Sequence, residues 1–437
     1  MAEDYLLTQY AVTDLAAITR GRGAWGTEDE GLKSSVGWVP INQVISPFDG
    51  IPASNPWGSH GDCRLRPDSD SLVDVALEGG PRLRFALCDI TDLAGDEAGV
   101  CARSFLRRMI EALGARGLRI MASFEQEFWL RLPGAPTATP GFSLQRAIGH
   151  EPFGSSLMAL LERAAISPEM LLAEFAPEQF ELTLAPAFGL AAADRAVVSR
   201  ELTRAAARHA GGHASFAPTR APGGIGSGVH VHLSLWDMDG KPVLHDPDGP
   251  GGLSAIGQAF SAGVVRHMAA LCALTASSVI SYERLQPHRW SSAYTCMGDR
   301  NREAALRICP IVSTSATPPA SQFNVEYRAA DATANPYLVL GGLIAAGLNG
   351  IAENLDAPPL INTDPSEMAQ ADLDALGIKR LPQSLDEALD RLEADDVLCS
   401  ALGAPLVEAY LLAKRHEARE CAEMTLDSTY AAYAEIY

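Results

Sequence analysis

Residues 228–234 read Gly-Val-His-Val-His-Leu-Ser, and residues 124–128 read Phe-Glu-Gln-Glu-Phe. In both stretches polar side chains alternate with apolar ones. Successive side chains of a β-strand point to opposite faces, so the two histidines share one face of their strand, as do the two glutamates of theirs. Phe, Val and Leu occupy the other faces. The sequence therefore predicts two strands that bury an apolar face and present ionisable groups on the opposite one.

Two further stretches repeat this pattern: residues 174–181 begin and end with glutamate, and residues 325–328 read Val-Glu-Tyr-Arg. A buried carboxylate without a partner costs several kcal/mol, so converging glutamates require cations. Oxygen donors with a minority of imidazole favour Mg²⁺ or Mn²⁺ over zinc, and no cysteine stands near these stretches in the sequence. A single Glu-x-Glu would more often face solvent on an edge strand. Four such stretches together predict a site for two metal ions, with these candidate ligands: Glu125, Glu127, Glu174, Glu181, His230 and Glu326.

Four arginines fall within two dozen residues of otherwise apolar sequence: Arg284, Arg300, Arg302 and Arg307. Guanidinium groups match the oxygens of carboxylates and phosphates and stay charged when partly buried. A structural ion pair is the alternative explanation for any one of them. Beside two metal ions, the set favours phosphoryl transfer.

Composition restricts the partners and the location of the protein. With 34 basic and 54 acidic residues the net charge is −20, which argues against nucleic acid or an anionic membrane as a partner. Eight cysteines without Cys-x-x-Cys spacing, and no secretory signal, predict reduced thiols and a cytoplasmic location. Residues 334–352 are uncharged and almost long enough to span a membrane, but their proline and glycines favour a buried helix.

Two domains are expected, residues 1–96 and 97–437. The first is rich in Gly, Pro and Asp with short apolar runs, which is typical of a small strand-rich domain. A helical period follows over 97–116, and a strand is expected over 118–130. Apolar periodicity predicts further helices over 155–165, 190–210, 254–278, 335–355, 384–393 and 405–419.

The motifs of this chain resemble those of the glutamine synthetase family, of the bacterial type-I kind, nearly end to end. The matching stretches are residues 125–127, 174–181, 226–235, 301–307 and 326–337. The resemblance implies an α+β fold, with a small β-grasp-like N-terminal domain before a catalytic domain of a curved antiparallel sheet and flanking helices. It also implies a homo-oligomer of stacked rings with active sites between subunits. The family's reaction phosphorylates the side-chain carboxylate of glutamate with ATP, using two Mg²⁺ or Mn²⁺ ions per site, before an amine displaces the phosphate.

The resemblance also implies roles for individual residues. One metal would be held by Glu127, Glu174 and Glu181, and the other by Glu125, His230 and Glu326. The nucleotide would contact His232, Ser234, Arg302 and Arg307. The acid or its acyl phosphate would contact Gly226, Arg284 and Arg328. Three arginines, Arg284, Arg302 and Arg328, would act directly in the reaction.

Three positions depart from the family pattern. Trp290 stands six residues after Arg284, where members that use ammonia carry a glutamate that takes a proton from ammonium. A neutral indole cannot act as a base, but it can line a pocket or contact an amine, so Trp290 is a candidate substrate-binding residue. In addition, Ile225 replaces an asparagine and Asn324 replaces an arginine. The residues that would activate the carboxylate are retained, whereas the residue at the ammonium-binding position is changed. The sequence therefore predicts a γ-glutamylamine ligase.

Three alternatives remain open at this point. A true glutamine synthetase would use another residue or water as the base. A non-catalytic scaffold or sensor of nitrogen metabolites would not need so many converging charges. A metal-dependent hydrolase would leave the paired arginines Arg302 and Arg307 unexplained.

Overall fold

The N-terminal part of the chain forms a six-stranded sheet in the order β2-β1-β6-β4-β3, with β5 paired to β6. The computed structural model describes residues 5–58, 60–289 and 291–437. β1 and β6 are parallel and the other pairs are antiparallel. The predicted strand-rich domain is therefore confirmed. Its strands are β1 Tyr5–Thr13, β2 Thr19–Thr27, β3 Val36–Trp38, β4 Cys63–Pro67, β5 Val73–Ala76 and β6 Arg82–Thr91.

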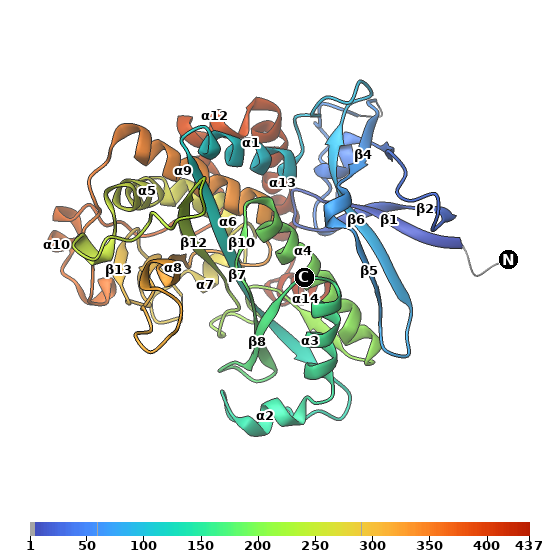
Figure 1. The fold of residues 1–437 in the computed structure, drawn as a ribbon, viewed down its shortest axis with the longest axis horizontal. Helices are drawn as coiled ribbons and strands as arrows, with labels where there is room; N and C mark the ends of the chain where they lie inside the picture. Colours follow the sequence, from blue (N-terminus) through green and yellow to red (C-terminus); the bar gives the residue numbers. More distant parts are fainter. Residues whose placement is uncertain (1–4, 59, 290) are drawn as a thin grey trace.

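The rest of the chain is built around a curved nine-stranded sheet in the order β13-β14-β15-β12-β7-β9-β8, with β10 and β11 also paired to β7 (Figure 1). All pairs are antiparallel except β13 with β14, so the sheet expected to be antiparallel is mixed at one edge. The strand predicted over 118–130 is the long β7. The strands are β7 Leu118–Arg131, β8 Pro168–Ala173, β9 Gln179–Leu184, β10 Ala187–Phe188, β11 His213–Ser215, β12 Val229–Asp237, β13 Met297–Asp299, β14 Leu306–Ile308 and β15 Val325–Tyr327.

The helices predicted from the sequence are present, but one of them is split into two. The helix expected over 254–278 breaks at His267, whose ring nitrogens lie 2.6 Å from Asp395 and 3.0 Å from Asn349. Such contacts with distant residues leave no periodic signal in the sequence. The helices are α1 Ala102–Gly114, α2 Leu144–Gly149, α3 Phe153–Arg163, α4 Leu190–His209, α5 Ala255–Arg266, α6 Met268–Thr275, α7 Ser281–Arg284, α8 Pro319–Gln322, α9 Pro336–Glu353, α10 Gln370–Ala375, α11 Leu385–Glu393, α12 Asp396–Leu402, α13 Ala404–Ala422 and α14 Leu426–Ile436.

Helix α9 is the apolar segment of near-membrane length, and it lies in the core. It packs against α1, α5 and α6, and 72% of its 18 residues are buried inside the protein. A Cβ atom on Gly350 would lie 2.0 Å from the carbonyl oxygen of Ala259, so the glycine permits the close contact with α5. The expectation of a buried helix is confirmed.

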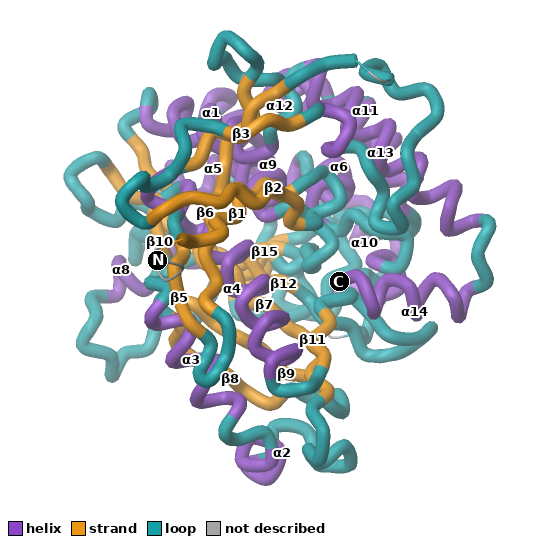
Figure 2. The backbone as a smooth tube through the Cα atoms, turned by 90° about the vertical axis from the view of Figure 1, so that its right-hand side faces the viewer, coloured by secondary structure: helices purple, strands orange, loops and turns teal. Residues whose placement is uncertain are grey.

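Helix α4 covers one face of the large sheet, as Figure 2 shows where it passes in front of the strands. Gln126 of β7 points to this helix and donates a hydrogen bond to the Ala196 carbonyl at 3.0 Å. Because side chains alternate along β7, the neighbouring Glu125 and Glu127 point to the other face. The sheet therefore separates an apolar core from a face that carries the charged residues.

Candidate active site

Strand pairing brings the predicted metal ligands of β7, β9, β12 and β15 together. Glu125 lies opposite His230 in the pairing of β7 with β12, and Glu127 lies opposite Glu181 in the pairing of β7 with β9. Glu326 of β15 lies opposite His232. Side chains of opposed residues in neighbouring strands point to the same face, so residues from four strands meet at one place on the sheet.

The closest contacts join imidazoles to carboxylates. Nδ1 of His230 lies 3.4 Å from Oε1 of Glu326 and 3.5 Å from Oε2 of Glu125. Glu125, Glu181 and His230 each offer a ligand atom, and these atoms lie within 4.8 Å of one another. This grouping joins Glu181 to two members of the other predicted metal set. The division of the six ligands between two ions therefore remains a prediction.

Glu127 is fixed by the loop that precedes β12. Its Oε2 accepts hydrogen bonds from the Gly228 backbone at 2.9 Å and from Nε2 of Gln179 at 3.1 Å. Gln179 also donates to the Gly226 carbonyl. Glu174, immediately after β8, accepts a hydrogen bond from the next backbone N–H and is half-buried.

The electrostatics of the site fit divalent cations. Burial, with repulsion from Glu125 and three other carboxylates, raises the pKa of Glu181 to about 9. Burial also raises the pKa of Glu127 to about 7. Nε2 of His230 is buried and has no hydrogen-bond partner within the described residues. A divalent cation would neutralise the crowded carboxylates and could be coordinated by the free Nε2 of His230. The donor set therefore suits Mg²⁺ or Mn²⁺.

Two of the carboxylates are instead held in their charged form. Burial opposes ionisation of Glu125, but contacts with His230 and His232 keep the pKa of Glu125 well below its ordinary value. Burial likewise opposes ionisation of Glu326, whereas His230 and Arg328 lower its pKa to about 2. The site therefore contains both ionised and protonated carboxyl groups when no metal is bound.

Two arginines are paired with Glu326. Nη1 of Arg307 donates to Oε2 of Glu326 at 2.7 Å, and Nη1 of Arg328 donates to Oε1. Arg328 also donates to the carbonyl of Arg302, whose side chain is exposed. Arg300 pairs with its neighbour Asp299 at the surface, so a structural ion pair accounts for this arginine.

Arg284 is buried directly beneath the glycines that lead into β12. It donates hydrogen bonds to Ser291 Oγ at 2.9 Å and to the carbonyl of Ala330 at 2.5 Å. A Cβ atom on Gly226 would lie 2.4 Å from Cγ of Arg284, so only glycine permits this approach. Burial lowers the pKa of Arg284.

Two of the four predicted nucleotide contacts line a cavity beside the metal ligands, whereas Arg302 and Arg307 are not in its wall. His232 and Ser234 lie in the wall of this cavity, whose volume is about 390 Å³ and whose lining includes Glu125 and Asn324. Nδ1 of His232 lies 2.8 Å from Oδ1 of Asn324, so the residue that replaces the family's arginine contacts the histidine. Trp290 lies outside the described residues.

Sequence reasoning missed two residues of the site, Gln179 and Cys309. No cysteine stands near the metal-ligand stretches in the sequence, but the fold brings Sγ of Cys309 to 3.8 Å from Oε2 of Glu326. Cys309 stands two positions after Arg307, and Gln179 stands two positions before Glu181. The alternation that identified the glutamates therefore also contained a signal for these two residues.

Sequence profiles of known families match both parts of the chain. The profile described as the glutamine synthetase N-terminal domain matches residues 2–96, and the profile of the glutamine synthetase catalytic domain matches residues 99–433. A gamma-glutamylpolyamine synthetase of Streptomyces coelicolor is 33% identical over 94% of this chain and 87% of its own length. A glutamine synthetase of Thermococcus kodakarensis is 33% identical over 82% of this chain and 77% of its own.

Solved structures have the same fold. A crystal structure described as a novel glutamine synthase homolog has a TM-score of 0.90 and 44% identity, and the match covers 99% of this chain and 98% of the other. A structure of GmaS with ADP has a TM-score of 0.80, with 96% and 94% of the two chains covered, but at 24% identity it supports the fold alone. The matched profiles, the relatives and the arrangement of the site agree, and this chain belongs to the glutamine synthetase family.

Proposed function

We propose that this protein is an ATP-dependent ligase that joins the side-chain carboxylate of glutamate, or a similar acid, to an amine larger than ammonia. The observation that carries the proposal is the convergence of acidic and imidazole groups from four strands beside buried arginines and a cavity. Family membership supports the reaction class, and the relative from Streptomyces coelicolor is named for a γ-glutamylpolyamine product.

The charged groups suit activation of a carboxylate. A free carboxylate is a poor electrophile, and phosphorylation gives it a leaving group. Arg307 and Arg328 lie on either side of Glu326, where guanidinium groups can stabilise charge on a phosphoryl group. Bound Mg²⁺ or Mn²⁺ would neutralise phosphate oxygens, and the proposed ligands are the six named glutamate and histidine residues.

The proposed acid site is formed around Gly226 and Arg284. Arg284 is fixed by hydrogen bonds to Ser291 and to the Ala330 carbonyl, so its position is set before any substrate arrives. Pre-organised donors bind an anionic group without the cost of ordering a flexible side chain. We assign this arginine to binding of the acid.

The choice of amine rests on Trp290. This residue stands where ammonia-using relatives carry a carboxylate, and an indole cannot accept the proton that ammonium must lose. An alkyl amine can instead gain apolar contact and a cation–π interaction of about 0.5 to 2 kcal/mol. The proposal therefore keeps carboxylate activation and changes the nucleophile.

The decisive experiment measures ATP turnover and product mass with glutamate and a panel of amines. The panel contains ammonia, methylamine, putrescine and spermidine, and each reaction is run with Mg²⁺ and with Mn²⁺. We expect γ-glutamylamides from at least one organic amine at a higher kcat/KM than glutamine from ammonia. Ammonia as the best substrate would identify a true glutamine synthetase. Absence of thermal stabilisation by Mg²⁺ and ATP would favour the non-catalytic alternative.

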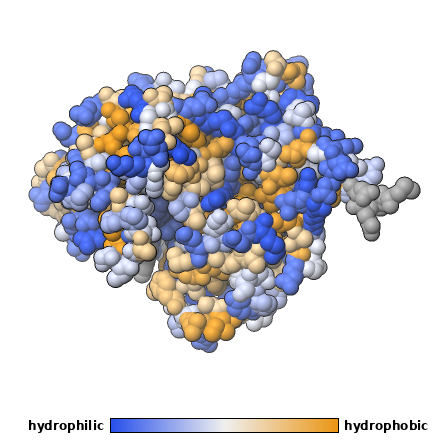
Figure 3. All heavy atoms as spheres, viewed as in Figure 1, coloured by the Kyte–Doolittle hydropathy of each residue, from blue (hydrophilic) through white to orange (hydrophobic). Residues whose placement is uncertain are grey.

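We also infer a homo-oligomer with active sites shared between subunits. Phe142, Leu144 and Ile148, which lie in and beside α2, are 56%, 73% and 61% exposed, and apolar surface gathers at this end of the molecule (Figure 3). Such a patch commonly marks a protein contact. Light scattering would test this, and Leu144→Lys should dissociate the assembly without unfolding the subunit.

We infer a cytoplasmic location as well. The eight cysteines form no disulfide, as expected in a reducing compartment. Fractionation of cells expressing the tagged protein would test this.

A further inference from the structure

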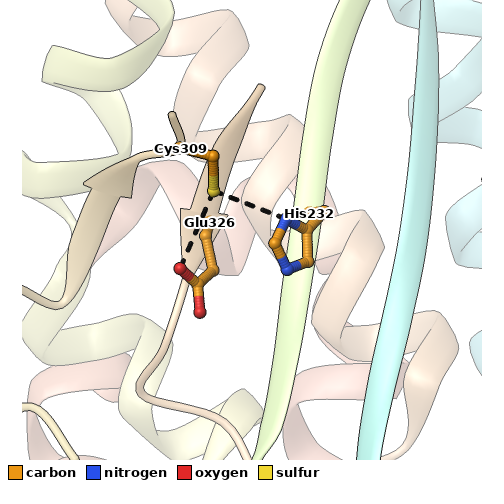
Figure 4. Close-up of side chains that lie close together, drawn as sticks. All are labelled: His232, Cys309 and Glu326. Atoms are coloured by element: carbon orange, nitrogen blue, oxygen red, sulfur yellow. Dashed lines mark hydrogen bonds between the residues drawn. The ribbon is translucent and has the colours of Figure 1, made fainter. Parts of the chain in front are cut away.

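A cysteine, a histidine and a glutamate meet at the nucleotide end of the site. Sγ of Cys309 lies 3.6 Å from Nδ1 of His232 and 3.8 Å from Oε2 of Glu326, and Figure 4 shows the three side chains close together. His232 lies on β12 and Glu326 on β15, and Cys309 directly follows β14. Their ligand atoms lie within 4.8 Å of one another. Nothing in the proposed ligase reaction uses the thiol.

The spacing of these atoms matches a tetrahedral zinc site. With zinc bonds of about 2.3 Å to sulfur and about 2.1 Å to nitrogen or oxygen, tetrahedral angles place sulfur about 3.6 Å from each of the other two donors. The observed separations from Cys309 are 3.6 and 3.8 Å. The two separations from sulfur therefore need adjustments of only a few tenths of an ångström, and the donor atoms of His232 and Glu326 lie within 4.8 Å of each other.

The amide oxygen of Asn324 is hydrogen-bonded to the histidine and would become a fourth donor by moving to about 3.4 Å from Nδ1. Oδ1 of Asn324 lies 2.8 Å from Nδ1 of His232, and the backbone N–H of Cys309 donates to the Asn324 carbonyl, which fixes the two residues side by side. An amide oxygen can bind a cation, whereas an arginine at this position would repel it. His232 and Asn324 line the 390 Å³ cavity, which gives the cation a path of entry.

Metal binding would change the protonation of the histidine and use a free lone pair of the glutamate. Nε2 of His232 lies 3.2 Å from Oε1 of Glu125 but makes no hydrogen bond within the described residues. Nδ1 faces the amide oxygen of Asn324, which can only accept, so Nδ1 carries a proton that a metal would displace. Oε2 of Glu326 already accepts from Arg307, and its second lone pair remains for a cation.

We propose that His232, Cys309 and Glu326, with Asn324, bind one thiophilic divalent cation such as Zn²⁺, and that this cation and Mg²⁺–nucleotide exclude each other. Binding forms the metal–sulfur and metal–nitrogen bonds and releases the protons of the thiol and of Nδ1 to solvent. The exclusion rests on the proposed function, because His232 is assigned to the nucleotide and Glu326 to a magnesium ion. The cation site itself does not depend on ligase activity.

Cobalt provides a direct test, since Co²⁺ replaces zinc and its bond to thiolate gives a near-ultraviolet charge-transfer band. We titrate the metal-free protein with Co²⁺ and compare Cys309→Ser with Cys399→Ser. Cys399, on α12, is the matched control because its thiol is more accessible than that of Cys309. We expect the thiolate band to saturate at one Co²⁺ per subunit, to be retained in Cys399→Ser and to be lost in Cys309→Ser, with at least a tenfold loss of Co²⁺ affinity at this site. A band that is absent, or that survives in Cys309→Ser, overturns the site.

The exclusion is tested separately on the cobalt-loaded protein. Adding ADP with excess Mg²⁺ should bleach the band, and Zn²⁺ should raise the nucleotide concentration needed for thermal stabilisation. A band that persists at saturating Mg²⁺–ADP would refute the mutual exclusion of cation and nucleotide but would not contradict the cation site. A protein that shows the cobalt band but forms no γ-glutamylamide would refute the ligase proposal alone.

Discussion

Replacement of Glu181 by glutamine should stabilise the metal-free protein and abolish its response to Mg²⁺. Burial disfavours the ionised form of Glu181, and repulsion by four neighbouring carboxylates adds to this effect, so its pKa rises to about 9 from an ordinary value of 4.5. The folded protein then retains a proton that the unfolded chain has released. Stability therefore falls as pH rises above about 4.5 and stops falling once pH passes about 9.

The size of the stability loss follows from the pKa shift of Glu181. Each pH unit in this window costs about 1.4 kcal/mol per group, so Glu181 alone lowers the free energy of unfolding by about 3 kcal/mol between pH 5 and 7. Glu127, with a pKa of about 7, steepens the fall over the same range. Glu125 and Glu326 have lowered pKa values, so their contributions to stability are complete above pH 4.5 and are lost only in more acidic solution.

Urea unfolding from pH 5 to 9, with EDTA or with Mg²⁺, measures the effect. We expect the metal-free wild-type protein to lose stability across this range and Mg²⁺ to restore most of the loss. Metal-free Glu181→Gln should exceed metal-free wild type by about 5 kcal/mol at pH 8 and gain little from Mg²⁺. Glu162→Gln, on the exposed side of α3, is the control and should follow wild type. A wild-type stability that is flat or rises with pH in EDTA would refute the reasoning.

Three further predictions concern the acid site, the amine and the core. Gly226→Ala should displace Arg284, raise KM for glutamate and destabilise the fold by about 1 to 3 kcal/mol. Gly114→Ala is the control, because a Cβ atom on Gly114 meets open space, and it should have none of these effects. Steady-state kinetics and urea unfolding compare the two variants. Trp290→Glu should move the ratio of kcat/KM for ammonia to that for the best organic amine at least about tenfold toward ammonia, and an unchanged ratio would remove this residue from the amine site. Lys414→Met leaves a fully buried glutamate without its cation, so calorimetry should show a loss of about 3 kcal/mol with little change in KM for ATP.

Much of the site could be predicted because the alternation of side chains is a local property. His230 with His232, and Glu125 with Glu127, share a strand face in any fold that makes these stretches strands. The helices expected from apolar periodicity are present for the same reason, including the buried α9. The sequence thus determined which residues carry charge and to which face of their own strand they point.

Only the tertiary structure decided which strands are neighbours. The pairing of β12 with both β7 and β15 places His232 beside Glu125 and Glu326, and no local pattern specifies that order. Cys309 reaches His232 through the pairing of β14 with β15, which the sequence around Cys309 does not specify. Strand order and register follow from packing between distant segments, whereas side-chain alternation follows from the geometry of each strand by itself.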